Sequence, residues 1–318
     1  MSSTHAGIVW NPSKTTREDL EAALNDARRS GAGTTVSWFE TSEDDPGGDA
    51  ARRALDAGAD VILAAGGDGT VRAVAEHLAD TNAQAELGII PLGTGNLLAR
   101  NLDIPVGDLP AAFARALEGA ARPLDIGWAE VELQDGVQRH AFAVMAGFGI
   151  DAHMITETDD DLKDRAGWLA YVESLGRAVS ASEVIDIRLA LDGGDAVPEK
   201  AHTLIVGNCG TLQGGITLLP DADPGDGQLD LLVLHADGIA GWVDTMRNLV
   251  WDNGLKKLLR GDREREMAES GDTTTHRRLA SITIELDRPR MFEVDGDTLG
   301  ETTRIEISLQ PGALRIRR

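Results

Sequence analysis

The chain has 318 residues, 42% of them hydrophobic, which is enough for two domains of roughly 100–200 residues with buried cores. Its net charge of −23 argues against a nucleic-acid partner, because nucleic-acid binding requires a basic surface. One cysteine, Cys209, excludes an internal disulfide and a cysteine metal cage. No apolar run reaches the ~20 residues that span a bilayer, and Met1 to Ala6 lack a signal-peptide pattern, so we expect a cytoplasmic protein.

Short apolar segments alternate with amphipathic helical patterns in the N-terminal part of the chain. This alternation predicts a doubly wound parallel α/β sheet with helices on both faces. Thr16 with Asp19 resembles a capping box, and Asp108 begins a further helix that extends to about Glu118. A helix is expected after each of the predicted strands, which are residues 8–10, 34–39, 61–65 and 87–90.

The stretch from Gly66 to Thr70 connects the apolar strand 61–65 with a helix that has an apolar face over 71–78. Free backbone N–H groups and the helix dipole favour an anion at such a turn, and glycines let the backbone approach a phosphate. Asp68 would repel that phosphate unless a metal ion lies between them, or unless its carboxylate accepts a proton from an attacking hydroxyl. The turn therefore predicts a nucleotide site with Mg²⁺; a tight turn that requires positive φ is the alternative.

Two other polar turns follow predicted strands. Asn11 to Thr15 follows the first strand, and its Ser13, Lys14 and Thr15 could offer donors to a phosphate. Gly93 to Asn96 follows the fourth strand. Because turns after successive parallel strands gather at one sheet edge, we expect the three turns to form a single nucleotide site. For the first turn, an ordinary helix cap is the alternative.

The pattern changes to alternating strands near Leu124-Asp125-Ile126-Gly127, which predicts an antiparallel β domain. Asp135-Gly136 marks a hairpin, helical patterns interrupt the strands at 161–179 and 239–259, and 261–276 is polar and expected to be mobile. The expected strands are 128–133, 137–144, 185–191, 202–206, 229–234, 281–286, 291–294, 304–309 and 313–316.

Two acidic segments are candidates for chemistry. Alternate carboxylates from Glu293 to Asp297 are costly unless solvated, bound to a metal or used as a base, and a simple Asp-Gly turn is the alternative. The loop from Asp221 to Asp226 suits a hard cation, with a solvated turn as the alternative. A third candidate is a basic cluster for membrane contact, or a solvated helix face, made of Lys256, Lys257, Arg260, Arg263, Arg265, Arg277 and Arg278.

Taken in order, these motifs resemble the diacylglycerol kinase catalytic family, which includes bacterial lipid kinases and sphingosine kinases. The resemblance covers nearly the whole chain, although the Gly-Gly-Asp-Gly turn alone is shared with NAD kinases and phosphofructokinases. It implies an α/β ATP-binding domain over 1–127, to which strands at about 303–318 return, and a C-terminal antiparallel β-sandwich domain over 128–302 for a lipid substrate. It rests on Asn11-Pro12, Gly66 to Thr70, Pro91 to Asn96, Leu124 to Gly127 and Val294 to Asp297.

The resemblance also implies residue roles. Asp68 and Asp125 would hold or orient a catalytic Mg²⁺, and Asp297 would be the general base. Asp226, with the carbonyls of Leu229 and Leu231, would bind a structural Mg²⁺. The residues implied to contact ATP are Asn11, Pro12, Ser13, Lys14, Thr15, Thr41, Gly66, Gly67, Asp68, Gly69, Thr70, Val71, Arg72, Gly93, Thr94, Gly95 and Asn96.

Three parts of the chain depart from the family pattern. Lys14 and Thr15 replace small residues and glycine, and Leu97-Leu98 replaces a polar-aromatic pair. Asp297 stands where bacterial members have glutamate, so a reach of ~3 Å to the hydroxyl requires a backbone shift or an intervening water.

We expect an ATP- and Mg²⁺-dependent kinase that converts a lipid alcohol, diacylglycerol first among them, at the inner face of the cell membrane; a homodimer stays open. Two alternatives are an NAD kinase, disfavoured because Leu97 follows Asn96, and a non-catalytic nucleotide- or lipid-binding regulatory module. Candidates for an acyl-chain slot, with the domain core as the alternative, are Met145, Phe148, Ile150, Met154 and Trp168.

Overall fold

A computed structural model of the chain describes residues 4–28, 34–149, 184–212, 217–235 and 274–318. Its described helices are α1 (Arg17–Ala27), α2 (Gly48–Asp56), α3 (Asp68–Asp80), α4 (Leu97–Asn101) and α5 (Leu109–Glu118). Its described strands are β1 (His5–Trp10), β2 (Thr35–Glu40), β3 (Val61–Gly66), β4 (Glu86–Pro91), β5 (Ala121–Leu133), β6 (Gly136–Phe142), β7 (Met145–Phe148), β8 (Ile185–Leu191), β9 (Val197–Ala201), β10 (Thr203–Gly207), β11 (Leu229–Leu234), β12 (Thr274–Leu279), β13 (Ser281–Val294) and β14 (Asp297–Arg317).

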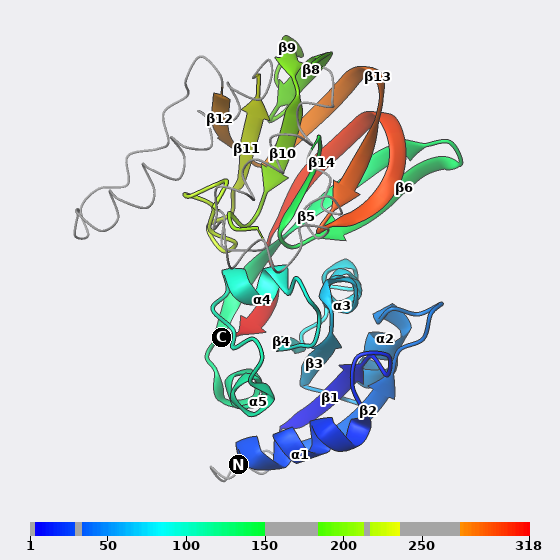
Figure 1. Ribbon diagram of the computed structural model, residues 1–318, viewed down its shortest axis with the longest axis vertical. Helices are drawn as coiled ribbons and strands as arrows, with labels where there is room; N and C mark the ends of the chain where they lie inside the picture. The colour runs from blue at the N-terminus through cyan, green and yellow to red at the C-terminus, as the bar shows by residue number, and fades with distance from the viewer. Residues whose placement is uncertain (1–3, 29–33, 150–183, 213–216, 236–273) are drawn as a thin grey trace, which may run out of the picture.

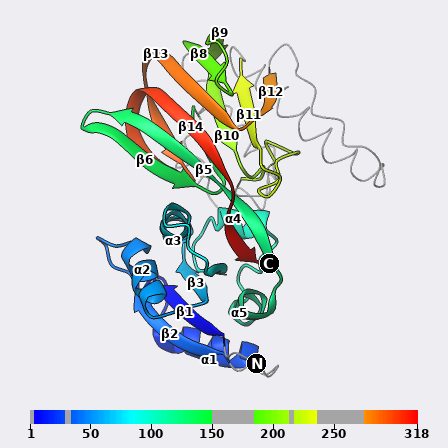
Figure 2. The same ribbon diagram turned by 180° about the vertical axis from the view of Figure 1, so that it is seen from behind.

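The N-terminal part is a doubly wound α/β layer, as the sequence predicts. Strands β4, β3, β1 and β2 lie side by side in this order and are parallel. Helices α1 and α5 pack against one face of the sheet, and α2 and α3 pack against the other (Figures 1 and 2). This order brings the carboxyl ends of the four strands to the edge that faces the second domain.

The helix boundaries have local causes that the sequence exposes. Thr16 caps α1 by accepting a hydrogen bond from the Asp19 N–H, and Asp108 caps α5 by accepting one from the Ala111 N–H. Helix α2 ends just before Gly58, whose φ of +78° suits a glycine after a helix. Every residue of β3 is buried, as expected of a central parallel strand. These predictions are confirmed.

The C-terminal part is an antiparallel β domain with a core of its own. Strands β8 and β13 alternate buried and more exposed residues, and their buried side chains join those of β5, β7, β10, β11 and β14 in one apolar cluster. Phe148 is 3% exposed within this cluster. It therefore packs in the core, which is the alternative that the sequence analysis gave for this residue.

Two long strands, β5 and β14, run through both parts and join them. Their antiparallel pairing extends from Ile305 opposite Val131 to Arg317 opposite Ala121, with an irregularity between Gln310 and Leu314. Beyond it, Ile316 pairs in parallel with Leu87 of β4. The sequence analysis expected shorter strands here, because Pro311-Gly312 looks like a turn; it is a bulge within one strand. Likewise β5 begins before Trp128, and β13 is one strand from Ser281 to Val294.

Some expectations lie outside the described residues. These are the helical segments 161–179 and 239–259, three slot candidates (Ile150, Met154 and Trp168) and the lysines and first three arginines of the basic cluster. Residues 274–276, expected to be irregular, belong to β12. None of the described helices is both long and apolar enough to cross a lipid bilayer.

Candidate active site

The three polar turns follow adjacent strand ends, as predicted. Trp10 pairs with Ala65 and Gly66 pairs with Pro91 in the parallel ladders. The ladder continues into the turns, because the Asn11 N–H donates to the Ala65 carbonyl at 3.0 Å and the Leu92 N–H donates to the Gly66 carbonyl at 2.9 Å. The backbone itself thus aligns the three turns along the sheet edge.

The glycine turns before α3 and α4 lie directly against each other. A Cβ added to Gly93 would lie 2.8 Å from the Gly67 Cα and 3.0 Å from the Asn96 Oδ1. Asn96 closes the second turn, since its side chain accepts a hydrogen bond from the Gly93 N–H and donates one to the Gly93 carbonyl. The turns therefore need glycine at these positions in order to approach this closely.

Asp68 links the two glycine turns. Its carboxylate accepts hydrogen bonds from the Asn96 N–H at 2.8 Å and from the Leu97 N–H at 2.6 Å, which are the first N–H groups of α4. Asn96 has a φ of +48° and stands at the start of α4, but its side chain accepts no hydrogen bond from the N–H groups of that helix. Asp68 thus caps a helix that begins 29 residues later in the chain. This structural role was not expected from the sequence.

The first turn of α3 suits an anion. Gly67 precedes the helix with no side-chain cap, and the first helical hydrogen bond runs from the Val71 N–H to the Gly67 carbonyl. The N–H groups of Asp68, Gly69 and Thr70 precede that bond, at the positive end of a 13-residue helix. These donors fit the phosphates of a nucleotide.

The site also fits Mg²⁺ in the form in which nucleotide enzymes bind it. A carboxylate that accepts two N–H bonds, as Asp68 does, keeps lone pairs for a cation. Mg²⁺ commonly binds one or two carboxylates together with substrate phosphates. In the part of the chain that the structure describes, no group of three His, Cys, Asp or Glu side chains could hold a metal. Phosphate oxygens would therefore supply much of the coordination.

The first turn and Thr41 adjoin the same edge. The Asn11 Oδ1 accepts hydrogen bonds from the N–H and the hydroxyl of Ser13, which folds the turn back on itself. Lys14 is exposed, and its N–H donates to the Asn11 carbonyl. Thr41 is buried, and its N–H donates to the Trp10 carbonyl. The predicted contacts of these residues with ATP stay predictions.

The hairpin between β13 and β14 separates two neighbouring carboxylates. Asp295 and Gly296 have φ of +48° and +87°, which is a two-residue turn of the Asp-Gly kind. Asp295 is buried and accepts hydrogen bonds from the N–H groups of Ala143, Val144 and Met145. Burial raises the pKa of the Asp295 carboxyl to about 6, although these hydrogen bonds and the Arg72 charge oppose the shift. Asp295 therefore fastens the hairpin to the segment between β6 and β7 and to the first residue of β7.

Asp297 reaches the glycine turn from the other domain. Its Oδ2 lies 3.8 Å from the position of a Cβ added to Gly69, and it accepts a 2.7 Å hydrogen bond from the Arg72 Nη2 on α3. The Asp297 side chain is 50% exposed, so it is open to a second substrate. The structure thus brings Asp297 beside the Gly66–Arg72 segment, although 225 residues separate Arg72 and Asp297.

Asp125 of β5 makes its side-chain contacts with the acidic loop and with β14. Its carboxylate accepts hydrogen bonds from the Gly227 N–H at 2.7 Å and from the Gly312 N–H at 2.6 Å, and its side chain is buried. These bonds fasten the acidic loop and the β14 bulge to β5. The predicted role of Asp125 in orienting the catalytic Mg²⁺ gains no support from these contacts and stays a prediction.

Strand β11, which follows the acidic loop, contains a residue that the sequence analysis missed. Asp230 is 9% exposed, its Oδ2 has no hydrogen-bond partner, and Arg278 lies 3.5 Å from its Oδ1. Burial raises its pKa to about 6, with Arg278 opposing the shift and Asp226 and Asp221 adding to it. Asp230 is buried whereas Asp226 is exposed, but the sequence of the strand gives no signal of this difference. The predicted structural Mg²⁺ at Asp226, Leu229 and Leu231 stays a prediction.

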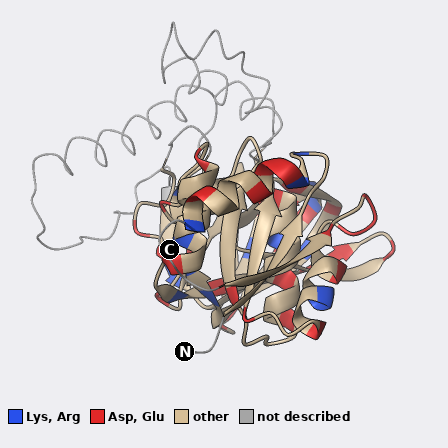
Figure 3. Cartoon of the chain, turned by 90° about the horizontal axis from the view of Figure 1, so that it is seen from below, with Lys and Arg blue, Asp and Glu red and all other residues tan. Residues whose placement is uncertain are grey.

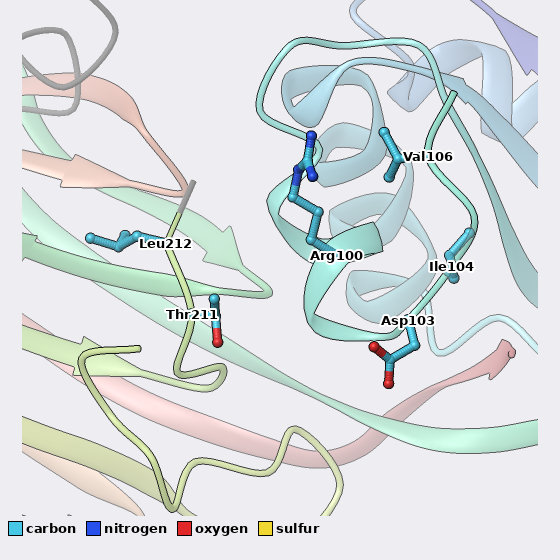
Figure 4. Close-up of a pocket in the computed structure, with 6 residues that line it drawn as sticks. All are labelled: Arg100, Asp103, Ile104, Val106, Thr211 and Leu212. Atoms are coloured by element: carbon cyan, nitrogen blue, oxygen red, sulfur yellow. The ribbon is translucent and has the colours of Figure 1, made fainter. Parts of the chain in front are cut away.

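The two domains also meet beside α4. The Asn101 side chain donates to the Thr211 carbonyl at 2.8 Å and accepts from the Thr211 N–H at 3.0 Å. Next to this pair is a hollow of about 420 Å³ between the segment after α4 and the segment after β10 (Figure 4). It is lined by Arg100, Asp103, Ile104, Val106, Thr211 and Leu212.

The surface charge is consistent with the acidic composition. Viewed from below, acidic positions are spread over the helices and loops of the α/β domain, with basic positions scattered among them (Figure 3). Of the predicted basic cluster, Arg277 and Arg278 are described, and Arg278 donates to the Asp221 carbonyl. That arginine is thus engaged within its own domain.

The fold and the site together define a class of protein. It is a two-domain enzyme that binds a nucleotide, with a carboxylate of the β domain beside the glycine turn of the α/β domain. Comparisons with known proteins agree. Residues 5–129 match the diacylglycerol kinase catalytic domain, and residues 144–318 match the YegS C-terminal NAD kinase beta sandwich-like domain. The chain belongs to this family of diacylglycerol-kinase-like lipid kinases, and it is a phosphotransferase with an alcohol acceptor.

Individual relatives extend over most of the chain. A Pseudomonas aeruginosa protein named "Probable lipid kinase YegS-like" is 32% identical over 97% of this chain and 92% of its own length. A Staphylococcus aureus protein named "Diacylglycerol kinase" is 29% identical over 74% of this chain and 72% of its own length. A solved diacylglycerol kinase of Bacillus anthracis shares the fold, with a TM-score of 0.68 at 22% identity, covering 99% of this chain and 96% of that one.

Proposed function

We propose that the protein transfers the γ-phosphate of ATP to the primary hydroxyl of a lipid, with diacylglycerol as the first candidate and phosphatidic acid as the product. The observation that carries the proposal is the position of Asp297, a half-exposed carboxylate beside the anion-binding turn of α3. A phosphate bound to that turn and a hydroxyl beside Asp297 would lie next to each other. The names of the relatives support a lipid acceptor.

The chain's own groups have separate tasks in this reaction. The N–H groups at the start of α3 bind the phosphates, and Asp297 accepts the proton of the lipid hydroxyl. The hydroxyl oxygen forms a bond to the γ-phosphorus while the bond from that phosphorus to the bridging oxygen breaks, and ADP leaves. When bound, Mg²⁺ neutralises charge that develops on the phosphate oxygens. Asp68 is the carboxylate placed to hold it.

The lipid would be met at the inner face of the cell membrane by a cytoplasmic protein. A chain with a net charge of −23 is repelled by anionic lipid, so contact requires local basic or apolar surface. Met145, which is only partly buried, remains a candidate for acyl-chain contact. A peripheral contact, without a membrane span, is the arrangement we propose.

The direct test is product identification. The purified protein is incubated with γ-labelled ATP, Mg²⁺ and separate vesicles that contain diacylglycerol, ceramide, a sphingoid base or a polyprenol. We expect label in a lipid product, first of all in phosphatidic acid. Label in soluble NADP after incubation with NAD would instead show an NAD kinase. Nucleotide binding with no transfer to any of these acceptors would show a regulatory module.

A further inference from the structure

Arg72 lies at the centre of a group of carboxylates from both domains. Its Nη2 donates to Asp297 at 2.7 Å, and its Nη1 lies 3.6 Å from the Oε2 of Glu76 one turn further along α3. The Arg72 charge also acts on the buried Asp295. Glu76 in turn accepts a hydrogen bond from the Ala141 N–H of β6. One guanidinium therefore links α3 to the hairpin that carries the base.

The Arg72 side chain is not fully satisfied in this position. It is 18% exposed, and its Nε is buried with no hydrogen-bond partner. A buried donor without a partner costs free energy. Moving the Arg72 side chain to a position where its Nε gains a partner would therefore cost less free energy than moving an arginine whose donors are all bonded. The contact with Glu76 is long for a hydrogen bond. The bond to Asp297 is therefore the main interaction that Arg72 would give up if its side chain moved to another partner.

Arg72 also stands between two sites that compete for it. It follows the anion-binding turn by two residues, and a triphosphate bound there brings more negative charge than one carboxylate. While the Arg72 Nη2 donates to the Asp297 Oδ2, the guanidinium occupies the side of this oxygen that a lipid hydroxyl would need to reach. The phosphate needs the positive charge of Arg72, and the base needs an unoccupied carboxylate. Both needs are met if Arg72 leaves Asp297 when the γ-phosphate binds.

We propose that Arg72 is a nucleotide-dependent latch: it holds Asp297 while the γ-phosphate site is empty and moves its hydrogen bond to the γ-phosphate when ATP binds. The move leaves Asp297 free to accept the proton of the lipid hydroxyl only when a phosphate is present to be transferred. Arg72 is thus a positioning residue for the base. This inference rests on the proposed function, because it takes the α3 turn as the γ-phosphate site.

The test measures binding, which needs no turnover. Isothermal titration gives the affinities of Mg²⁺ with the non-hydrolysable triphosphate AMP-PNP and of Mg²⁺ with ADP. In Arg72→Ala we expect AMP-PNP to bind about tenfold more weakly with ADP unchanged, since one charge-assisted hydrogen bond is lost. Arg72→Lys should retain part of the preference. The matched control is Arg139→Ala, because Arg139 pairs with Asp80 at the other end of α3, about 12 Å along the helix axis.

A double-mutant cycle separates a latch from a fixed contact. If Arg72 must leave Asp297, Asp297→Asn strengthens AMP-PNP binding severalfold, and the gain is smaller in the Arg72→Ala background. If the Arg72–Asp297 pair instead stays intact when AMP-PNP binds, Asp297→Asn gives the larger gain in affinity in the Arg72→Ala background. The reason is that, without Arg72, nothing screens the repulsion between the Asp297 charge and the phosphate. This result overturns the latch.

Equal losses of AMP-PNP and ADP in Arg72→Ala also overturn the latch, and the labelled-product assay then still stands as the test of the proposed function. Failure of the wild type to bind either nucleotide overturns both. Unchanged ADP affinity in each variant shows that the fold is intact.

Discussion

The two sides of the active site are assembled in different ways. On the α/β side, each polar turn directly follows its strand, and the strands are parallel neighbours, so local sequence brings the phosphate donors together. On the β side, Asp297 meets α3 because a hairpin places it there, across 225 residues of chain. The proposed phosphate site is thus a property of short motifs, whereas the position of the proposed base depends on long-range strand register.

This difference divides the expected effects of substitution. The α/β side combines backbone donors with a carboxylate that also caps a helix, so changes there affect nucleotide binding and stability together. The β side presents one half-exposed carboxylate whose neighbour, Asp295, fastens the hairpin. Changes at Asp297 should therefore lower turnover while the backbone donors of the glycine turn and the hairpin stay intact.

The largest effect is expected for Asp297→Asn. Loss of a general base lowers kcat by about 10²–10⁴-fold, while the affinity for ADP should not fall, since the backbone turn is untouched. Steady-state transfer of labelled phosphate to lipid vesicles measures kcat. Asp297→Glu is the matched control and should keep measurable activity, because it retains the carboxylate. An Asp297→Asn enzyme with wild-type kcat would remove the base from the mechanism.

Asp68→Asn is expected to lower kcat by about 10²–10³-fold, through loss of the carboxylate proposed to hold Mg²⁺. Asp68→Ala should in addition lower the free energy of unfolding by about 1–3 kcal/mol, since the N–H groups of Asn96 and Leu97 lose their acceptor. Denaturant titration of the two variants separates the effects. Equal stability of Asp68→Ala and the wild type would contradict the capping role.

The α/β side could be predicted almost completely from sequence. The glycine turns, the caps at Thr16 and Asp108 and the parallel strands follow from local patterns of polarity and turn residues. The double role of Asp68 could not be predicted, because its partners lie in the next βα turn and the αL conformation of Asn96 is set by that packing.

The β side could be predicted only in part. Alternation reveals strands such as β8, but it does not show that Pro311-Gly312 is a bulge in β14 or that β5 runs through both domains. Strand pairing between distant segments fixes those features, and it also decides that Arg72 meets Asp297. The Asp-Gly turn at 295–296 was the alternative to a carboxylate cluster, and it is the arrangement found.

A smaller effect is expected for Gly93→Ala, which tests how closely the glycine turns approach. The added Cβ would lie 2.8 Å from the Gly67 Cα, so the turns must separate. We expect a KM for ATP raised about tenfold and a loss of stability of about 1–3 kcal/mol, which is typical of overpacking. Gly48→Ala is the control, since its Cβ would meet nothing within 4 Å. Wild-type KM and stability in Gly93→Ala would show that the turns are free to adjust.

The smallest effect is a pH dependence of stability that originates at Asp295. Burial raises the pKa of Asp295 to about 6 in the folded protein, above the value of ~3.9 in an unfolded chain. Its contribution is therefore complete below pH ~4 and is lost as the pH rises through about 6, because the unfolded chain releases its proton first. One such group gives a slope of at most about 1.4 kcal/mol per pH unit over that interval.

Denaturant titrations at several pH values measure this slope in the wild type and in Asp295→Asn. The difference between the two slopes belongs to Asp295, because the repulsion among the other charges of the chain is common to both proteins. Asp295→Asn should be less stable throughout, since one amide oxygen replaces two acceptors for three N–H groups. Its stability should nevertheless fall less steeply between pH 4 and about 6. Parallel curves would mean that Asp295 ionises in the fold as it does in the unfolded chain. A flatter curve of stability against pH for Asp295→Asn, with the affinity for ADP retained, would show that Asp295 fastens the hairpin within the β domain. It would also show that this role is independent of the chemistry at Asp297.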